Sequence, residues 1–410
     1  MNKKIVINIP QIEDILLFYF FTLPIWRDFV FSHLPGGSYF GSFLGLVALV
    51  AVTLVKQYRS LNRLIDVFLL YLVIILLFVF KFWGNPDMSE WIDRLYGLKS
   101  VITWGAPLGY IVIRLQYDFN RMMNVLKHTG LVLAIYYAWK SLEVITTGYW
   151  TIVQFDVERH STSNMSWSYG VLMAICFLSI YLLKDKKKIV LLPMILGVIG
   201  ILIYGSRGTI ICLVIGIVLL VLFFHEGKMT WKNYLLIFAI AAALIFLLSD
   251  NGLLMISTLL QNKGVSSRFI DSMVGFKFSN FEETSNGRWI IWITVLDLIK
   301  NGPFYGYGVY GERNAVYSLG MKWGYSHNIF LEILVSFGWL FGSIIIIFAV
   351  VQIVRFFRSS KNADEKLVFI LFLTIGFELL LSNSLWLQCA PWVLMALVTN
   401  HFQNSYSDLE

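Results

Sequence analysis

The chain has 410 residues, of which 58% are hydrophobic and 14% are charged, and its formal net charge is +7. Soluble globular proteins contain about 45–50% apolar and about 25% charged residues, so this composition excludes an ordinary cytosolic enzyme and a disordered or fibrous protein. Apolar runs close to the ~20 residues that cross a bilayer, together with 33 Phe, 20 Tyr and 14 Trp, indicate a polytopic membrane protein. We therefore expect the positive charge mostly in cytoplasmic loops, and it does not indicate a nucleic-acid partner.

The apolar windows predict an all-α fold with about twelve transmembrane helices in a single integral membrane domain, residues 1–410. In chain order the predicted spans are 12–31, 41–55, 64–82, 100–115, 129–147, 168–183, 189–204, 209–224, 233–249, 326–351, 367–385 and 389–402. Pro107 interrupts the fourth of these windows, and Pro391 lies in the last.

Lysine and arginine gather in alternate connections, and this bias places those connections and both termini in the cytoplasm. The cations that carry the bias are Lys56, Arg59 and Arg63, then Arg114, Arg121 and Lys127, then Lys184, Lys186, Lys187 and Lys188, then Lys228 and Lys232, and finally Arg355, Arg358, Lys361 and Lys366.

One connection, 250–325 between the ninth and tenth spans, is much longer than the others and is predicted to lie outside. Loops of this length are usually functional, so we expect it to carry part of an active site. Ser285 or Asn286 can cap a helix over 288–300, and Asn301-Gly302-Pro303 ends it. This helix has an apolar stripe suited to the membrane surface or to the helical bundle, formed by Trp289, Trp292, Ile293, Leu296 and Ile299.

Two arginines on the external side are candidate phosphate ligands. Arg207 lies in the tight turn Gly205-Ser206-Arg207-Gly208 between two apolar runs, where it is either a snorkelling rim residue or an anion ligand. Arg288 opens the predicted loop helix, where it either faces water or adds a planar fork to a helix N-terminus that attracts anions. Two further loop cations, Arg268 and Arg313, are expected to be solvated, with a possible supporting role at the substrate.

His327 lies where the long loop re-enters the membrane, in Tyr325-Ser326-His327-Asn328. Asn328 and Glu332 are four residues apart and share a helix face beside it. A single histidine at a helix end is more often structural, but this one shares the external region with the two arginines. Glu378, a carboxylate in the outer half of the eleventh span, is a further candidate.

The segment Gly306-Tyr307-Gly308-Val309-Tyr310-Gly311 matches the G-x-G-x-x-G pattern of dinucleotide sites. We reject that function because no strand precedes it, no helix clearly follows it, and it lies outside the cell. It is expected to form a turn in which Tyr307 can offer a ring face to a sugar.

Two arginines and a histidine outside the membrane suit chemistry on a phosphate-bearing substrate that arrives already activated. The arginines can hold a diphosphate in place of a metal, and a neutral histidine can accept the proton of an attacking hydroxyl. The sequence has no Walker motif, no H-E-x-x-H motif and no external carboxylate cluster suited to a metal, so we expect no metal or other cofactor.

Four motifs in this order resemble the O-antigen ligase and Wzy-type polysaccharide polymerase superfamily over about residues 200–345. They are Ser206-Arg207-Gly208, Gly287-Arg288, the Gly-Tyr-Gly turn after Pro303, and Ser326-His327-Asn328. Asn164, ahead of the sixth span, is similar to an asparagine of the family, although the Asn-Pro-Asn motif is missing.

The resemblance implies a metal-independent, inverting glycosyltransferase of the GT-C-like type in the bacterial plasma membrane, with its active site external. It would transfer glycan from undecaprenyl diphosphate, with Arg207 and Arg288 binding the diphosphate and His327 as the base. Its partners would be the lipid-linked oligosaccharide, the bilayer, a flippase and a chain-length regulator.

Two alternatives to a polymerase stay open. An O-antigen ligase would use the same residues and transfer the glycan to lipid A–core, but the Ile-, Lys-, Asn-, Phe- and Tyr-rich composition of an AT-rich genome favours a Gram-positive producer, which lacks that acceptor. A transporter or flippase also has about twelve spans. Its major-facilitator pattern predicts a long central cytoplasmic connection, whereas the one long loop here is external and off-centre.

Overall fold

A computed structural model describes residues 9–31, 37–56, 61–84, 101–115, 119–154, 157–161, 164–224, 287–320 and 324–407, with a few positions between 254 and 262. The chain divides into two compact units. Unit 1 comprises Met1–Thr129, Thr294–Ser359 and Asn383–Glu410, and unit 2 comprises Gly130–Ile293 and Ser360–Ser382. Both are predominantly helical, as the composition predicts.

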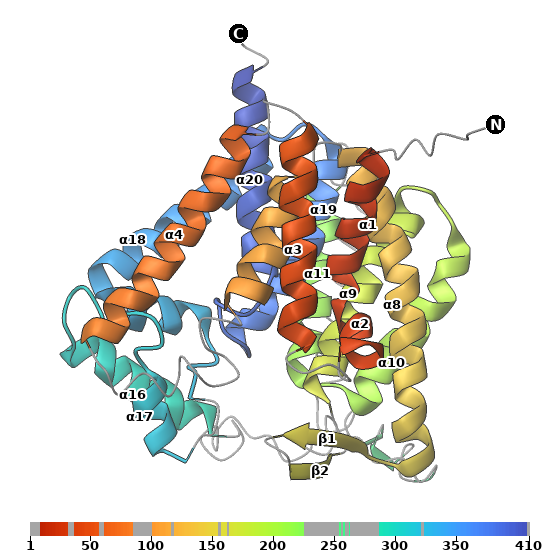
Figure 1. Cartoon of the computed structure of the whole chain (residues 1–410). Helices are drawn as coiled ribbons and strands as arrows, with labels where there is room; N and C mark the ends of the chain where they lie inside the picture. The colour runs from red at the N-terminus through yellow and green to blue at the C-terminus, as the bar shows by residue number, and fades with distance from the viewer. Residues whose placement is uncertain are drawn as a thin grey trace. The chain divides into compact units, whose positions relative to one another are not determined.

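The N-terminal helices of unit 1 follow the predicted spans with one early break. The first span divides into α1 (Ile9–Phe21) and α2 (Leu23–Phe29) at Thr22, because Pro24 lies in the first turn of α2. α3 (Gly37–Lys56) packs against α1, and α4 (Leu61–Gly84) is the longest of these four helices (Figure 1).

The fourth predicted span is irregular, as the proline within it suggests. It consists of two π-helical turns, η4 (Val101–Gly105) and η5 (Pro107–Ile111), and the short α7 (Val112–Arg114). These elements pack against α20 (Ala390–Ser407) and the residues just before it. Gly105 and Gly109 allow that contact, because a Cβ atom at either would lie about 2 Å from the carbonyl oxygen of Trp386 or Cys389.

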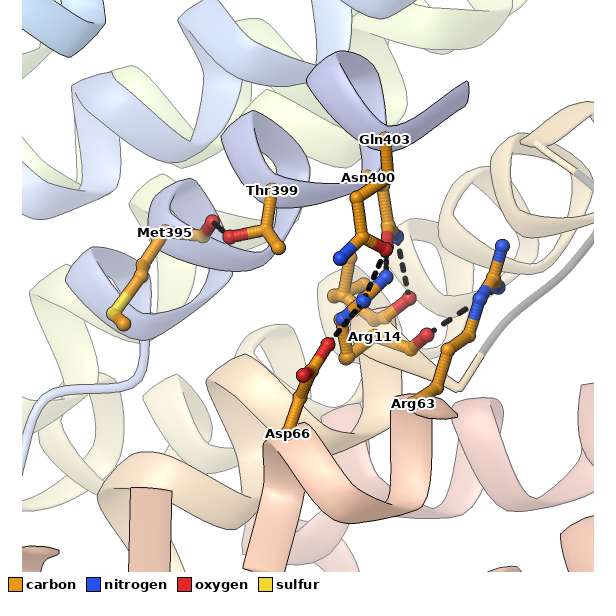
Figure 2. A network of polar contacts seen from close by, with 8 residues as sticks. Arg63, Asp66, Arg114, Met395, Thr399, Asn400 and Gln403 are labelled. Carbon is orange, nitrogen blue, oxygen red and sulfur yellow. Dashed lines mark hydrogen bonds and ion pairs between the residues drawn. The ribbon is translucent and has the colours of Figure 1, made fainter. Parts of the chain in front are cut away.

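A fully buried arginine joins the ends of α4, α7 and α20 in unit 1. Figure 2 shows the Arg114 guanidinium among the side chains of Asp66, Asn400 and Gln403, all of which accept its hydrogen bonds. Asn400 in turn donates to the carbonyl oxygen of Ile113 at 3.1 Å. The sequence placed Arg114 among the loop cations, but it is 0% exposed, and its partners offset the large desolvation cost of a buried charge.

The tenth predicted span is broken by a glycine. α18 (Ile329–Ser359) contains Gly338 at φ 76 and ψ 165, so it is two helical segments joined at a kink. The break leaves carbonyl oxygens without helical partners, and the loop after α16 (Arg288–Asn301) supplies the missing donors. Tyr307 N–H donates to Val335 O at 2.9 Å, and Gly308 N–H donates to Ser336 O at 2.8 Å.

Unit 2 contains α9 (Met165–Leu183), α10 (Leu191–Tyr204), α11 (Arg207–Phe223) and α19 (Ala363–Gly376), which ends in the short helix η8 (Phe377–Leu380). α9 is the buried centre, in contact with α10, α11 and α19 (Figure 1). α8 (Phe119–Thr147) runs from unit 1 into unit 2.

The all-α prediction is wrong at one place in unit 2. β1 (Trp150–Gln154) and β2 (Val157–Ser161) form an antiparallel hairpin with Thr151 opposite His160. The first strand is rich in β-branched and aromatic residues, which favour a pleated strand.

Among the described residues, three helices are long and apolar enough to cross a membrane: Asn62–Lys81, Met165–Leu183 and Ile329–Ser359. Phe43–Val55, Lys188–Tyr204 and Arg207–Phe223 are shorter apolar helices. The chain is therefore a membrane protein. The count of twelve spans stays a prediction, and the span 233–249 lies outside the described residues.

The orientation can be tested with introduced cysteines at two exposed positions. Ser318→Cys reports on the long loop, and Lys361→Cys reports on a connection rich in cations. We expect an impermeant thiol reagent to label Ser318→Cys, but not Lys361→Cys, in intact cells. Cys176 and Cys212 are buried, so replacing the half-buried Cys389 by alanine removes the main background. The reverse labelling pattern would invert the topology.

Candidate functional site

His327 stands at the start of α18 in a conformation that few residues other than glycine adopt. Its φ is 53°, and such strained positions are often found at functional sites. The neighbouring residues hold this turn. Ser326 Oγ donates to Asn328 O at 3.0 Å, and Asn328 Oδ1 accepts the N–H groups of Phe330 and Leu331 at 2.9 and 3.2 Å. Asn328 is therefore the cap of α18, and it presents the half-buried His327 at the helix end.

A column of rings and one cation lies beside His327. The Tyr325 and His327 ring centroids are 4.2 Å apart, and the Arg313 guanidinium carbon is 5.4 Å from the Tyr325 centroid. The same carbon lies 4.4 Å from the centroid of the Tyr310 ring. The expectation that Arg313 is solvated is wrong, because this residue is only 1% exposed.

Two buried carboxylates balance Arg313. Glu332 accepts hydrogen bonds from Ser384 Oγ at 2.5 Å and from the N–H of Leu385 at 2.9 Å, which joins α18 to the segment before α20. Glu312 immediately precedes α17 (Arg313–Ser318) and is 0% exposed. Burial, and after it the charge of Glu332, raises the pKa of Glu312 to about 7, although Arg313 acts in the opposite direction.

Lys81, on α4, is the fourth charged residue of this group. Its ammonium donates to the carbonyl oxygen of Tyr307 and interacts electrostatically with Glu312. Tyr307 thus contributes its backbone to the site, through this oxygen and through its N–H to Val335. The 306–311 segment is a turn, as expected, with Gly306 and Gly308 at φ near 80°. No strand precedes it in the described part of unit 1.

In unit 2, two helix N-termini lie side by side. Asn164 caps α9 by accepting the N–H of Trp167 at 3.0 Å, and Ser206 caps α11 ahead of Arg207. The backbone N–H of Asn164 donates to Tyr204 O at 3.3 Å, and the hydroxyl of Ser168 on α9 contacts that of Thr209 on α11 at 2.9 Å. Arg207 is half-buried in the first turn of α11.

The Tyr169 phenol interacts with the two remaining predicted residues of unit 2. It interacts electrostatically with Glu378 on η8 and with Arg288, the first residue of α16. Gly208 lies against this phenol, since a Cβ there would be 2.4 Å from its oxygen. The predicted helix over 288–300 is confirmed by α16, and Gly287 precedes it at φ 78°.

The predicted residues thus form two groups. Tyr307, Arg313, Tyr325, His327, Asn328 and Glu332 lie in unit 1, and Asn164, Arg207, Arg288 and Glu378 lie in unit 2. Convergence of the two groups stays a prediction, and Arg268 lies outside the described residues. Sequence reasoning missed Glu312, Ser384, Lys81 and Tyr169. Only Glu312 carried a signal, because it forms an acid–base dipeptide with Arg313 directly after the glycine-rich turn.

Residues 192–347 match the model of the family described as O-antigen ligase. The resemblance seen in the motifs is confirmed, since all four lie within the matched segment.

A curated relative, the ComP-specific O-oligosaccharyltransferase of Acinetobacter baylyi, is 29% identical over 110 residues. These cover 24% of this chain, which spans 20% of the length of that relative. No solved structure matches the chain.

The buried carboxyl of Glu312 makes stability depend on pH. Its pKa of about 7 lies above the ordinary value of 4.5, so the folded protein holds this proton more tightly than the unfolded chain. Stability therefore declines as pH rises from about 4.5 through 7, and Glu312→Gln should reduce that decline. Thermal unfolding of purified protein between pH 4.5 and 8 measures it, and equal pH dependence in wild type and variant would contradict the assignment.

Proposed function

We propose that the chain is a polysaccharide polymerase in the bacterial plasma membrane. It transfers glycan from undecaprenyl diphosphate onto a lipid-linked repeat unit at the outer face. The observation that carries the proposal is the presence of two groups in the segment that matches the O-antigen ligase family: a histidine at a strained helix start, and arginines at helix N-termini. A flippase would supply the donor, and a chain-length regulator would act on the product.

The group in unit 2 is suited to the diphosphate of the donor. α9 and α11 begin side by side, and the positive ends of their dipoles attract anions. Arg207 and Arg288 each stand in the first turn of a helix, where the dipole disfavours a cation. A bound anion relieves this repulsion, so phosphate oxygens would stabilise both arginines electrostatically. They would also stabilise the charge that develops on the leaving diphosphate, without a metal.

The group in unit 1 is suited to activating the acceptor. A hydroxyl oxygen of the acceptor sugar attacks the anomeric carbon of the donor as the bond from that carbon to the diphosphate oxygen breaks. The hydroxyl proton passes to the neutral imidazole of His327, and the configuration at the anomeric carbon inverts. The two electrons of the broken bond leave with the lipid diphosphate, which Arg207 and Arg288 hold.

The acceptor separates three reactions that share this chemistry. A polymerase uses a second lipid-linked repeat unit, a ligase uses lipid A–core, and the relative from A. baylyi is named as an O-oligosaccharyltransferase specific for ComP. The amino-acid composition is typical of an AT-rich genome and favours a Gram-positive producer. Such a cell lacks lipid A–core, so the composition supports the polymerase.

Purified full-length protein should convert undecaprenyl-diphosphate repeat units alone into a ladder of longer lipid-linked chains. The assay contains EDTA, because the arginines replace a metal, and activity that needs an added divalent cation would contradict this. Transfer only after addition of lipid A–core would identify a ligase, and transfer only to a hydroxyl-bearing protein would identify an oligosaccharyltransferase. Absence of all three products would refute the proposal.

Substitutions should separate the two groups of residues. His327→Ala should lower kcat by about 10²–10⁴-fold, the usual contribution of a general base, while donor binding is retained. Arg207→Lys and Arg288→Lys should each weaken donor binding by about tenfold or more, because lysine lacks the bidentate fork. Product formation and binding of labelled donor measure the two effects. Full activity of His327→Ala would exclude this histidine as the base.

A further inference from the structure

Arg313 is a buried cation near His327. Its guanidinium carbon lies 4.4 Å from the centroid of the Tyr310 ring and 5.4 Å from that of the Tyr325 ring, and the residue is 1% exposed. A guanidinium stacks on aromatic faces through cation–π contacts, which strengthen when the group is removed from water. A planar guanidinium therefore suits contact with both rings better than an ammonium would.

The surroundings of Arg313 argue against a direct role in binding the donor. Glu312 and Glu332, both buried, interact electrostatically with it and already offset its charge. A diphosphate at this place would add negative charge beside two carboxylates in a site of low dielectric, which is unfavourable. Under the proposed function, the donor ligands are Arg207 and Arg288.

The contacts of Arg313 lead instead to His327. The Tyr325 ring is close to both residues, and the two distances place the guanidinium carbon within about 10 Å of the imidazole centroid. The other charged and titratable groups that face this column are Tyr310 and Glu312 ahead of α17, Glu332 on α18 and Lys81 on α4.

We propose that Arg313 is a positioning residue, which holds the Tyr325 ring against His327 and keeps the imidazole neutral so that it can accept a proton. The proposal rests on the assignment of His327 as the base. Glu312 and Glu332 allow the guanidinium to remain buried, and Glu332 also fixes the Ser384–Leu385 segment to the start of α18.

Two variants separate the charge of Arg313 from its shape. Arg313→Gln removes the cation and should raise the pKa of His327 by about one unit, the size expected for a unit charge at this distance in a partly buried site. Arg313→Lys keeps the charge, so the pKa should stay in place. It loses the stacked plane, so kcat should fall by about 10- to 100-fold through misplacement of the base. Donor KM should not change in either variant.

The pKa of His327 can be measured without any substrate. The rate at which diethylpyrocarbonate modifies His327 in the purified full-length protein, followed by mass spectrometry between pH 5 and 8, reports the neutral imidazole. A failed polymerisation assay therefore refutes the proposed reaction and leaves this measurement intact. Lys300→Gln, which removes an exposed cation from the end of α16, is the matched control and should leave the pKa unchanged.

The Tyr325 ring provides an independent test. Tyr325→Phe keeps the ring and should retain kcat, whereas Tyr325→Leu should lower it as Arg313→Lys does. If Arg313→Gln does not fold, Arg313→Lys and the two Tyr325 variants still test the positioning role through kcat. An unchanged pKa of His327 without the cation, or a tenfold higher donor KM in Arg313→Lys, would overturn the proposal.

Discussion

The backbones of Gly306 and Gly338 approach so closely that a Cβ atom on Gly338 would lie 1.9 Å from the carbonyl oxygen of Phe304. This approach is possible only where α18 is interrupted, and the interruption exposes the carbonyl groups that Tyr307 and Gly308 then bind. The loop that carries Glu312 and Arg313 is thereby fixed to the helix that carries Glu332 and begins beside His327. Neither glycine can be replaced by a residue with a side chain, because a Cβ atom would overlap backbone atoms of the other segment. The geometry of the candidate base thus depends on two residues that have no chemical role.

The sequence predicted the elements of this site better than their contacts. The helix over 288–300 was predicted from local capping residues and begins at Arg288, since capping is a local property. The spans expected to begin at 209 and 326 begin at Arg207 and Ile329. Gly338 could not be recognised as a break, because one glycine in a long apolar run is compatible with a continuous helix. Arg313 was expected in water because its second carboxylate partner, Glu332, comes from another element and is brought close only by the tertiary fold.

The arginines of this chain fall into two physical classes. Arg114 and Arg313 are buried, and each is matched by carboxylates or amide oxygens of the protein itself. Arg207 and Arg288 stand in the first turns of helices, where the backbone adds positive potential. The first class is balanced in charge by carboxylates of the fold. Arg207 and Arg288 are half-buried, and they are the arginines to which the proposed function assigns the lipid diphosphate.

The network around Arg114 has a consequence for how the chain is made. Asp66 and Arg114 are synthesised early, but Asn400 and Gln403 follow Arg114 by 286 and 289 residues. During synthesis the arginine therefore has its carboxylate partner long before its amide partners, and its hydrogen bonds to Asn400 and Gln403 can form only once α20 has been made. The packing around Arg114, near the start of α4 and the end of α7, is thus completed only after most of the chain has been synthesised.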